Sequence, residues 1–322
     1  MPPSALTRPT LVPARRLWLA AGRKTDTNAS LRAAFARLGW PAARAGSTRL
    51  AAVASRDAVL GRLDVLPTLD GVEPGIWRLR HLERRGIRVL NRTGALLASH
   101  DKLATALAFG QAGLPHPRTS HVGGLARERG AIELPVVVKP RFGSWGRDVF
   151  LCETRRQLER CLRELGERSW FVRQGALVQE FVPPAGFDLR LVVAAGRVVG
   201  AIERVAAPGE WRTNVALGGR RRPVDELDPG AEALAVAAAG AVGGDLVGVD
   251  LLPVRGGYVV LEVNGAVDFS PAYALAGRDV YGEVAGALCD ALASAEPVEP
   301  LARTELLPRL GRGWLEPAAE AG

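Results

Sequence analysis

The sequence predicts a mixed α/β and α+β fold with more than one domain. Its 322 residues are 48% hydrophobic, which is enough to bury a sizeable core. Before residue 92, strand-like apolar runs alternate with helix-like segments, as in a small α/β unit. Farther along, short strands come in pairs joined by turns, as in the antiparallel sheets of α+β domains.

Charge and cysteine content narrow the function classes. The formal net charge is +8, which favours acidic partners such as ATP, glutamate-like substrates or nucleic acid. Cys152, Cys161 and Cys289 have unrelated spacings that form neither a metal motif nor an even disulfide set. No apolar run approaches the roughly 20 residues of a membrane span, and the first residues lack a signal-peptide pattern. We therefore expect a cytoplasmic protein that does not enter a membrane.

Residues 1–14 are rich in proline and are expected to form a flexible N-terminus. Residues 15–92 are expected to form a small α/β domain. Its predicted elements are, in order, a strand, a capped helix, an apolar segment, a helix and a strand, at residues 16–21, 27–39, 65–69, 76–85 and 87–90. The domain has no Gly-x-Gly-x-x-Gly sequence, so we do not expect it to bind a nucleotide by itself.

Two further units are expected from residue 93 onwards. Residues 93–182 are predicted to hold a helix, two strands, a helix and a strand, at 101–112, 134–139, 149–151, 154–165 and 176–182. Residues 183–300 are predicted to hold a hairpin, an alanine-rich helix and a strand pair, at 189–193 with 198–202, 231–242, and 246–252 with 258–263. Residues 301–322 are expected to be a C-terminal appendage.

Lysine is rare in this chain. Of 42 basic residues only Lys24, Lys102 and Lys139 are lysines, so each departs from the general use of arginine. A compact ammonium on a flexible stem fits sites where a planar guanidinium does not. Lys102 lies in the first turn of a predicted helix, and Lys139 ends an apolar strand that leads into a glycine-bearing loop. Lys102 and Lys139 together indicate a phosphate site.

The loop at residues 139–147 has the composition of a flexible lid over a triphosphate. Gly143 and Gly146 allow the backbone to approach a ligand closely, and backbone amides and the Ser144 hydroxyl can donate to anionic oxygens. No Gly-Lys-Ser/Thr sequence follows, so the loop is not a P-loop. An ordinary hairpin turn is the alternative interpretation.

Three oxygen-bearing side chains indicate a metal site. Glu262 and Asn264 share one face of a predicted strand because side chains alternate, and Asp250 lies on the preceding strand. Mg²⁺ prefers such oxygen ligands and completes its coordination with water and phosphate. Carboxylates in these apolar surroundings need a cation. Acidic residues at strand ends are also common without a metal, which is the alternative interpretation.

The predicted hairpin brings charged side chains together. Asp188 and Arg190 share a face. A two-residue turn would place Glu203 on that face, whereas a three-residue turn would place Arg204 there, and we favour the three-residue turn. The alternative is a solvated charged face. The basic segment 209–222 that follows either holds an anionic substrate or caps the sheet.

Taken in order, these motifs resemble the ATP-grasp superfamily, and within it the RimK-type carboxylate–amine ligases, over roughly residues 91–290. The motifs that carry the resemblance are Asp101-Lys102-Leu103, Val138-Lys139, Gly143-Ser144-x-Gly146, Asp188-Leu189-Arg190 and the segments 178–182, 201–204, 211–214, 248–250 and 261–264. The resemblance implies an ATP-grasp fold. Two α+β subdomains, at 93–182 and 183–300, would grip ATP, and a small α/β domain would precede them.

The resemblance also implies roles for single residues. Those expected to hold ATP are Lys102 and Lys139 at the α- and β-phosphates, Gly143, Ser144 and Gly146 in the lid, Glu180, Phe181 and Val182 at the adenine, and Asp188 near the ribose. Those expected to bind two Mg²⁺ ions, or Mn²⁺ in their place, are Asp250, Glu262 and Asn264. Those expected to face the reacting carboxylate and the γ-phosphate are Arg190, Arg204 and Asn214.

The implied reaction turns a carboxylate into an acyl phosphate with release of ADP, after which an amine displaces the phosphate and an amide forms. We favour the addition of glutamate to a small molecule, a peptide or a protein. The alternative is a LysX-like ligase that joins an acidic carrier protein to the α-amino group of aminoadipate or glutamate. A homo-oligomer is compatible with either interpretation.

A basic nucleic-acid-binding protein is a hypothesis from a different class. It would explain the net charge but not Asp250, Glu262 and Asn264, and 6% aromatic residues offer little for base stacking. We therefore expect no nucleic-acid partner.

The chain departs from the resembled family after Asn264. It reads Gly265-Ala266-Val267-Asp268-Phe269-Ser270, where relatives usually have a small-residue segment with Pro-Gly. The pocket for the acceptor amine is therefore the part of the site that the resemblance specifies least.

Overall fold

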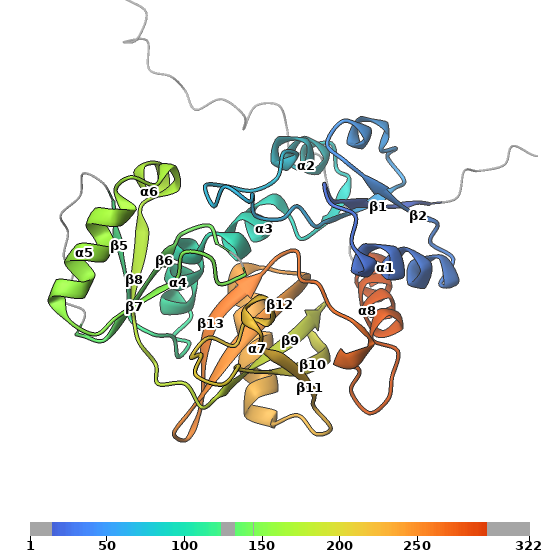
Figure 1. Ribbon diagram of the computed structural model, residues 1–322. Coiled ribbons are helices and arrows are strands. Elements are labelled where there is room, and N and C mark those ends of the chain that lie inside the picture. Colours follow the sequence, from blue (N-terminus) through green and yellow to red (C-terminus); the bar gives the residue numbers. More distant parts are fainter. Residues whose placement is uncertain (1–14, 124–132, 144, 295–322) are drawn as a thin grey trace, which may run out of the picture.

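The computed structural model describes residues 15–123, 133–143 and 145–294, and these form three sheets (Figure 1). The predicted N-terminal segment 1–14, the 301–322 appendage and Ser144 lie outside the described residues. Within the described part of the chain, no helix combines the length and apolar character that a bilayer span needs.

The first sheet is parallel, with the strand order β2-β1-β3-β4. Its strands are β1 (Leu17–Ala20), β2 (Ala42–Ala45), β3 (Ala58–Gly61) and β4 (Arg88–Leu90), and its helices are α1 (Asp26–Arg37) and α2 (Ile76–Arg84), with a 3-10 turn at Arg49–Ala52. The α/β class expected here is confirmed. Sequence analysis found the equally short β1 but missed β2 and β3, whose alanine and glycine residues have low strand propensity. The apolar segment 65–69 contributes only an isolated bridge between Val65 and Val72.

The second sheet is antiparallel, with the strand order β5-β8-β6-β7. Its strands are β5 (Thr119–Val122), β6 (Val136–Pro140), β7 (Phe150–Cys152) and β8 (Ala176–Glu180), and its helices are α5 (Arg155–Leu165) and α6 (Ser169–Gln174). Thr154 and Gln157 form a capping box that fixes the start of α5.

Two helices connect the first sheet to the second. They are α3 (Thr93–His100), which was not predicted, and α4 (Lys102–Gln111), which was. Asp101 separates them and caps α4, because its side chain accepts hydrogen bonds from the Leu103 and Ala104 amides. The cap places Lys102 at the first helical position, as predicted.

The third sheet is antiparallel, with the strand order β11-β10-β9-β12-β13. Its strands are β9 (Phe187–Ala194), β10 (Arg197–Val205), β11 (Arg220–Pro223), β12 (Leu246–Val254) and β13 (Gly257–Asn264), and its helices are α7 (Pro229–Val242) and α8 (Val280–Ser294). Short 3-10 turns lie at Val215–Leu217 and Pro271–Tyr273. Helix α8 was not predicted.

The two faces of the third sheet have different partners. On β9, Leu189 and Val193 belong to the core that α7 covers, while Val192 and Ala194 belong to a core shared with α8 and the first sheet. Figure 1 shows α8 beside α1. Because side chains alternate along a strand, Asp188 lies on the same face as Val192 but nearer the start of β9. One face of the sheet thus carries a buried core at one end and polar side chains at the other.

The β9–β10 hairpin corrects the predicted turn. Ala194 pairs with Arg197, so the turn has two residues, Ala195 and Gly196, rather than the predicted three. Both turn residues have positive φ, at 46° and 75°, as a tight hairpin turn requires. A β-bulge between Val198 and Gly200 then shifts the register by one residue. As a result Arg204 lies opposite Asp188. This position was predicted, but from a three-residue turn instead of a two-residue turn with a bulge.

Asn91 joins the first and third sheets. Its side chain donates hydrogen bonds to the carbonyl oxygens of Gly61 (3.2 Å), Leu246 (2.7 Å) and Gly265 (3.2 Å). Its amide oxygen accepts from the backbone N–H groups of Asp245 (2.8 Å) and Leu246 (2.9 Å). With the side chain buried, this one residue satisfies backbone groups at the ends of β3, β12 and β13.

We predict that Asn91→Ala lowers the free energy of unfolding by roughly 3 kcal/mol, because several buried backbone groups lose their partners. Denaturant unfolding followed by circular dichroism measures this. Arg92→Ala is the control, because the neighbouring Arg92 side chain is exposed and its loss should cost less than about 0.5 kcal/mol. Equal unfolding midpoints for the two variants would contradict the role given to Asn91.

Candidate active site

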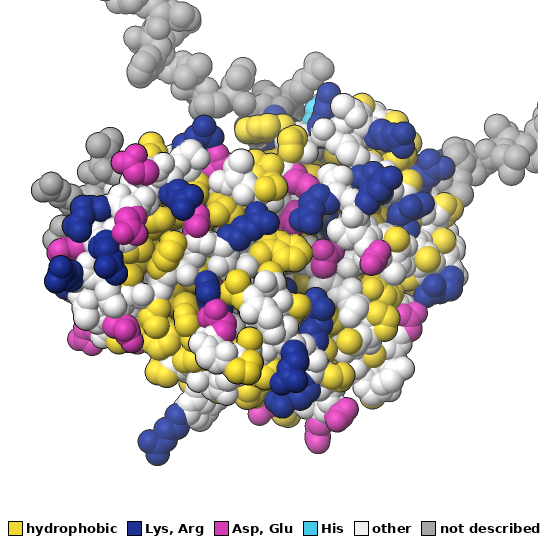
Figure 2. Space-filling model, in the orientation of Figure 1, with side chains coloured by type: hydrophobic (Ala, Val, Ile, Leu, Met, Phe, Trp, Pro, Cys, Tyr) yellow, Lys and Arg dark blue, Asp and Glu magenta, His cyan; other side chains and the backbone are white. Residues whose placement is uncertain are grey.

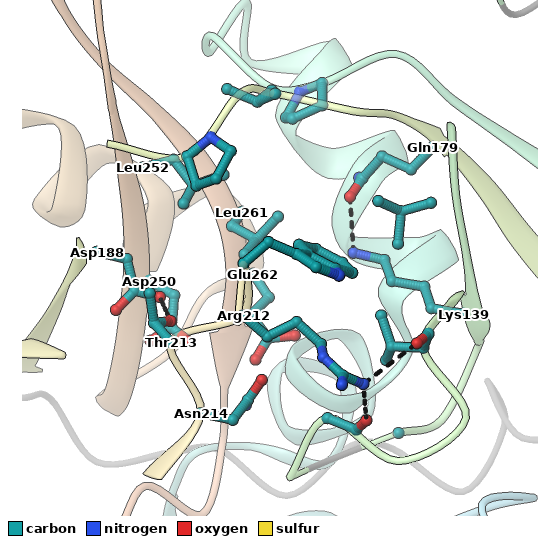
Figure 3. Close-up of a pocket in the computed structure, with 18 of the residues that line it drawn as sticks. Lys139, Gln179, Asp188, Arg212, Thr213, Asn214, Asp250, Leu252, Leu261 and Glu262 are labelled. Atoms are coloured by element: carbon teal, nitrogen blue, oxygen red, sulfur yellow. Dashed lines mark hydrogen bonds between the residues drawn. The ribbon is translucent and has the colours of Figure 1, made fainter. Parts of the chain in front are cut away.

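A cleft separates the second and third sheets (Figure 3). Lys139 on β6 and Gln179 on β8 line one wall, and Asp250 on β12 and Glu262 on β13 line the other. Leu261 adds an apolar surface between these polar groups. A cleft of this kind, apolar in part and with a few convergent charges, is typical of a small-molecule site.

Arg204 is the most deeply buried cation of the third sheet's polar end. Its guanidinium binds Asp188 in a bidentate manner at 2.7 and 2.5 Å, and its Nη2 also donates to Asp250 Oδ2 at 2.8 Å. Burial alone would lower the pKa of Arg204, but the adjacent Asp250 and Asp188 carboxylates raise it well above its usual value. The side chain is therefore a fixed, permanent cation.

Asp188 lines the cleft, and protein donors occupy its carboxylate. Both of its oxygens accept from Arg204, and Oδ2 also accepts from the Thr213 hydroxyl at 2.6 Å. The residue is only 1% exposed. Asp188 thus holds Arg204 in place, and its expected position near the ribose stays a prediction.

The row of alternating charges continues towards β13. Arg190 binds Asp250 in a bidentate manner at 2.7 and 2.6 Å, and its Nη2 lies 3.9 Å from Glu262 Oε1. Lys102 then binds Glu262 Oε2 at 2.9 Å. Burial alone would raise the pKa of Glu262, but Lys102 and Lys139 lower it well below its usual range. Glu262 is therefore ionised at neutral pH.

The three predicted metal ligands lie together. Asp250 and Glu262 are direct cross-strand partners, and Glu262 Oε1 accepts from the Asn264 amide at 3.4 Å. This set offers carboxylate and amide oxygens, which suits Mg²⁺. Three of the four lone-pair sites of Asp250 already accept from Arg190 and Arg204, so one site on Oδ1 remains for a metal. The donor set fits the ion with Glu262 and Asn264 as its more open members.

The two predicted phosphate lysines reach the cleft from different elements. Lys102 Nζ donates to the carbonyl oxygen of Gly143 at 2.8 Å, which fastens the glycine loop to the start of α4. Lys139 Nζ donates to Gln179 Oε1 at 2.7 Å (Figure 3). Burial, and then repulsion from Lys102, lower the pKa of Lys139 to about 8. Lys139 is thus a buried ammonium that has no anionic hydrogen-bond partner among the residues that the structure describes.

The predicted adenine segment lies where β8 leaves the second sheet. The Glu180 carboxylate accepts from Arg118 at 3.2 Å, and the Phe181 N–H donates to the carbonyl oxygen of Pro135 at 3.1 Å. The Val182 N–H has no partner among the described residues. Among the groups expected to contact adenine, the Val182 N–H is therefore a donor that is still available to a ligand.

The glycine loop is attached to the third sheet. Arg212 Nη1 donates to the carbonyl oxygens of Gly146 and Val149 at 3.5 and 3.3 Å (Figure 3). Gly146 has φ +69°, and a Cβ there would come within 2.7 Å of Asn214 Oδ1. Only glycine fits this approach. Asn214 thus lies directly against the loop, and its expected position at the reacting carboxylate stays a prediction.

A second pocket continues the cleft beyond the arginines. It shares Trp145, Arg204, Asn214 and Glu262 with the first and also contains Arg190 and Asn264. Its remaining lining includes Arg221, from the basic segment 209–222 considered above for an anionic substrate. It also includes residues that the sequence did not single out as site residues, namely Asp64, His100, Asp268 and Tyr273. Burial lowers the pKa of His100 to about 4, so its ring is neutral at pH 7.

Several side chains in the cleft were missed for a common reason. Gln179 and Thr213 act by binding another site residue, and such pairs depend on the register of neighbouring strands and loops. Asp64 and His100 come from the N-terminal part of the chain, which carries no motif of its own. The one available signal was position, because His100 directly precedes the Asp101-Lys102 motif.

A family model and a sequence relative show the family of this chain. Residues 116–288 match the RimK-like ATP-grasp domain. A probable alpha-L-glutamate ligase from Thioalkalivibrio sulfidiphilus is 36% identical over 236 residues, which cover 71% of this chain and 74% of that protein. The predicted family is thereby confirmed.

Solved structures confirm the fold. A RimK domain ATP-grasp protein from Sphaerobacter thermophilus has a TM-score of 0.61 and 27% identity, over 84% of this chain and 98% of that one. The D-alanine–D-alanine ligase of Bacillus anthracis, complexed with ATP, has a TM-score of 0.65 over 87% of this chain and 98% of that one. At 17% identity, the latter shows the shared fold alone.

We predict that Arg204→Met lowers the free energy of unfolding by about 3–5 kcal/mol, because two buried carboxylates lose their shared cation. Urea titration of the ligand-free protein measures this. Arg222→Met, on the exposed surface of β11, is the control and should cost no more than about 1 kcal/mol. If both variants lose the same small amount, Arg204 does not hold this end of the sheet together.

Proposed function

The chain belongs to the RimK-like ATP-grasp family, and we propose that it is an ADP-forming carboxylate–amine ligase that makes an amide through an acyl phosphate. The observation that supports this most is the row of Arg204, Asp250, Arg190 and Glu262, buried at its Arg204 end and half-buried at its Glu262 end, which faces Lys139 across the cleft. The row supplies fixed cations next to oxygen ligands for a metal. A carboxylate and a triphosphate repel each other, so bringing them together requires such cations.

We propose that ATP lies between the second and third sheets. The adenine would accept from the Val182 N–H, and the phosphates would take Lys139 and Lys102 as charged donors. Lys102 would then exchange its contact with Glu262 for a phosphate contact. The glycine loop would cover the phosphates with its backbone amides.

Glu262, Asn264 and the open lone pair of Asp250 would hold Mg²⁺. The bound ion would neutralise charge that develops on the phosphate oxygens. Releasing Lys102 from Glu262 would leave that carboxylate free for the ion. Lys102 would then bind a phosphate. The Lys102–Glu262 ion pair of the ligand-free protein would thus be replaced by a Lys102–phosphate contact and a Glu262–metal contact.

Arg190 and Arg204 would orient the carboxylate substrate. In the first step a carboxylate oxygen attacks the γ-phosphorus, the bond to the bridging oxygen breaks, and ADP leaves with the electron pair. In the second step the amine nitrogen attacks the acyl carbon, a proton passes to solvent, and phosphate leaves with its bridging oxygen. Both steps need positioning and charge neutralisation, and neither needs a covalent bond to the protein.

Relatives named as probable alpha-L-glutamate ligases support glutamate as one of the two substrates. Nucleic acid finds less support. On the face that Figure 2 shows, basic side chains are scattered among acidic and apolar ones rather than gathered in a stripe. The three cysteines are free, which suits a reducing cytoplasm.

The test of this function is a screen for ADP release with Mg²⁺ and ATP, using L-glutamate as amine and a set of peptides and small carboxylic acids. We expect ADP and phosphate to appear in equal amounts with a productive pair. Glu262→Gln should reduce turnover at least about a hundredfold, because a metal ligand loses its charge. Glu159→Gln, on the exposed side of α5, is the control and should match the native protein. Native-like turnover in Glu262→Gln would remove Glu262 from the metal site.

Lys139 makes nucleotide binding depend on pH. Its pKa of about 8 in the ligand-free protein means that the ammonium is present below pH 8 and is lost above it. We therefore expect the Kd for ATP to rise above pH 8 by up to about tenfold per pH unit, because ATP binds the charged form. Isothermal titration between pH 7.5 and 9.5 measures this.

Lys139→Arg should flatten that profile, because a guanidinium keeps its charge across the range. Lys24→Arg, which changes a lysine outside the cleft, should keep the native pH dependence. A native profile that is already flat would show that Lys139 does not contact the phosphates.

A further inference from the structure

The second pocket lies between the reaction centre and the N-terminal part of the chain. Arg190, Arg204 and Asn264 form its inner wall. Its outer wall is lined by Asp64 and His100 from the N-terminal part, by Asp268 and Tyr273 from the segment after β13, and by Arg221 from β11. Asp268 on this outer wall belongs to the segment 265–270, in which the sequence differs from the pattern of the resembled family.

Asp268 is a carboxylate with unused hydrogen-bond capacity. Its nearest cation is Arg62, whose Nη2 lies 3.5 Å from Oδ1, beyond the 2.7–2.9 Å of a charge-assisted hydrogen bond. Arg62 uses its closer bonds elsewhere, on Asn28 Oδ1 at 2.7 Å and on the carbonyl oxygen of Val267 at 2.8 Å. Arg62 therefore fixes the backbone before Asp268 and leaves the carboxylate, which is 44% exposed, open to a cationic group.

His100 adds a neutral acceptor to the same pocket. Its Nε2 lies 2.8 Å from the carbonyl oxygen of Leu63. A carbonyl oxygen can only accept, so in the neutral ring Nε2 carries the proton and Nδ1 carries a lone pair. Among the described residues, Nδ1 has no hydrogen-bond partner, although the residue is only 4% exposed. Because His100 lines the pocket, this lone pair can accept a hydrogen bond from a ligand or from water.

Arg221 supplies the opposite charge. Arg221 on β11 lies directly opposite Arg204 on β10 in the strand register. Its side chain therefore lies on the same face of the sheet as the reaction centre. It is exposed and makes no ion pair with any described residue. The pocket thus offers acceptors from Asp268 and His100 together with a free guanidinium.

We propose that this pocket binds the attacking amine substrate as a free α-amino acid, with its ammonium on Asp268 and His100 Nδ1 and a carboxylate on Arg221. The inference rests on the ligase function proposed above and adds residues that select the amine. An ammonium has three donors and no acceptor, which matches the two acceptors. Arg221 can take a carboxylate through two parallel hydrogen bonds. Bound in this way, the nitrogen would lie next to Arg190 and Arg204, where the acyl group forms. The ammonium would first lose one proton to solvent, which leaves a neutral amine whose lone pair attacks the acyl carbon.

The test is isothermal titration of L-glutamate, L-alanine and glutarate into the protein saturated with Mg²⁺ and a non-hydrolysable ATP analogue. Glutarate has the carboxylates of glutamate without the ammonium. We expect both amino acids to bind the native protein and glutarate to bind at least tenfold more weakly than glutamate. Asp268→Asn should weaken both amino acids at least tenfold and leave glutarate and the nucleotide analogue unchanged.

Two further variants separate the contacts. His100→Gln can keep a donor for Leu63 while removing the Nδ1 acceptor, so it should weaken the amino acids by several-fold. Arg221→Gln should weaken all three ligands. Asp290→Asn on α8 and Arg220→Gln, the neighbour of Arg221 on β11, are the controls, and both should bind as the native protein does.

Equal binding of amino acids to Asp268→Asn and Asp290→Asn would overturn the proposal. So would a native protein that binds the nucleotide analogue but neither amino acid, and in that case the ligase function would still stand. A native protein that does not bind the nucleotide analogue would overturn the ligase function and this inference together.

Discussion

The buried pairing of Arg204 with Asp188 and Asp250 is the interaction on which the site depends. Removing a guanidinium from water is costly, and a buried cation persists only where carboxylates and hydrogen bonds replace its hydration. Here one cation is shared by two acids from neighbouring strands, and Thr213 completes the hydrogen bonding of Asp188. The result is a charge whose position is set before any ligand arrives. Preorganised charge of this kind stabilises developing negative charge without the cost of reorienting solvent.

The sheet explains why this arrangement can coexist with a stable core. Along β9 the side chains of one face change from Asp188 and Arg190 to Val192 and Ala194, so the same face is polar at one end and packed against α8 at the other. The core around Val192 and Ala194 fixes the position of β9, and β9 in turn positions Arg190. Asn91 extends this rigidity to the first sheet by bonding the ends of β3, β12 and β13. The pocket between the first and third sheets therefore lies beside a junction that buried hydrogen bonds hold together.

Sequence reasoning found the elements with strong local signals and missed those that tertiary packing creates. The rare lysines, the glycine loop and the strand that carries Glu262 and Asn264 could be read directly, because alternation and composition mark them. The hairpin was harder. Arg204 was placed correctly, but through a three-residue turn, whereas the structure has a two-residue turn and a bulge at Val198–Gly200 that no local pattern announces. The bidentate contact between Asp188 and Arg204 depends on the same feature, because strand register places the two residues opposite each other. Asp64, His100 and Asp268 come together only when the first sheet packs on the third, so no motif contains them.

The central claim is that a carboxylate is activated at the γ-phosphate of ATP and not at its α-phosphate. Fixed arginines beside oxygen ligands for a metal favour the terminal phosphate, but adenylating enzymes form the same amide by the other route. Transfer of oxygen-18 separates the two. With both oxygens of the substrate carboxylate labelled, mass spectrometry of the products should find one labelled oxygen in free phosphate and none in any nucleotide. Label in AMP would contradict the account, whatever the fold.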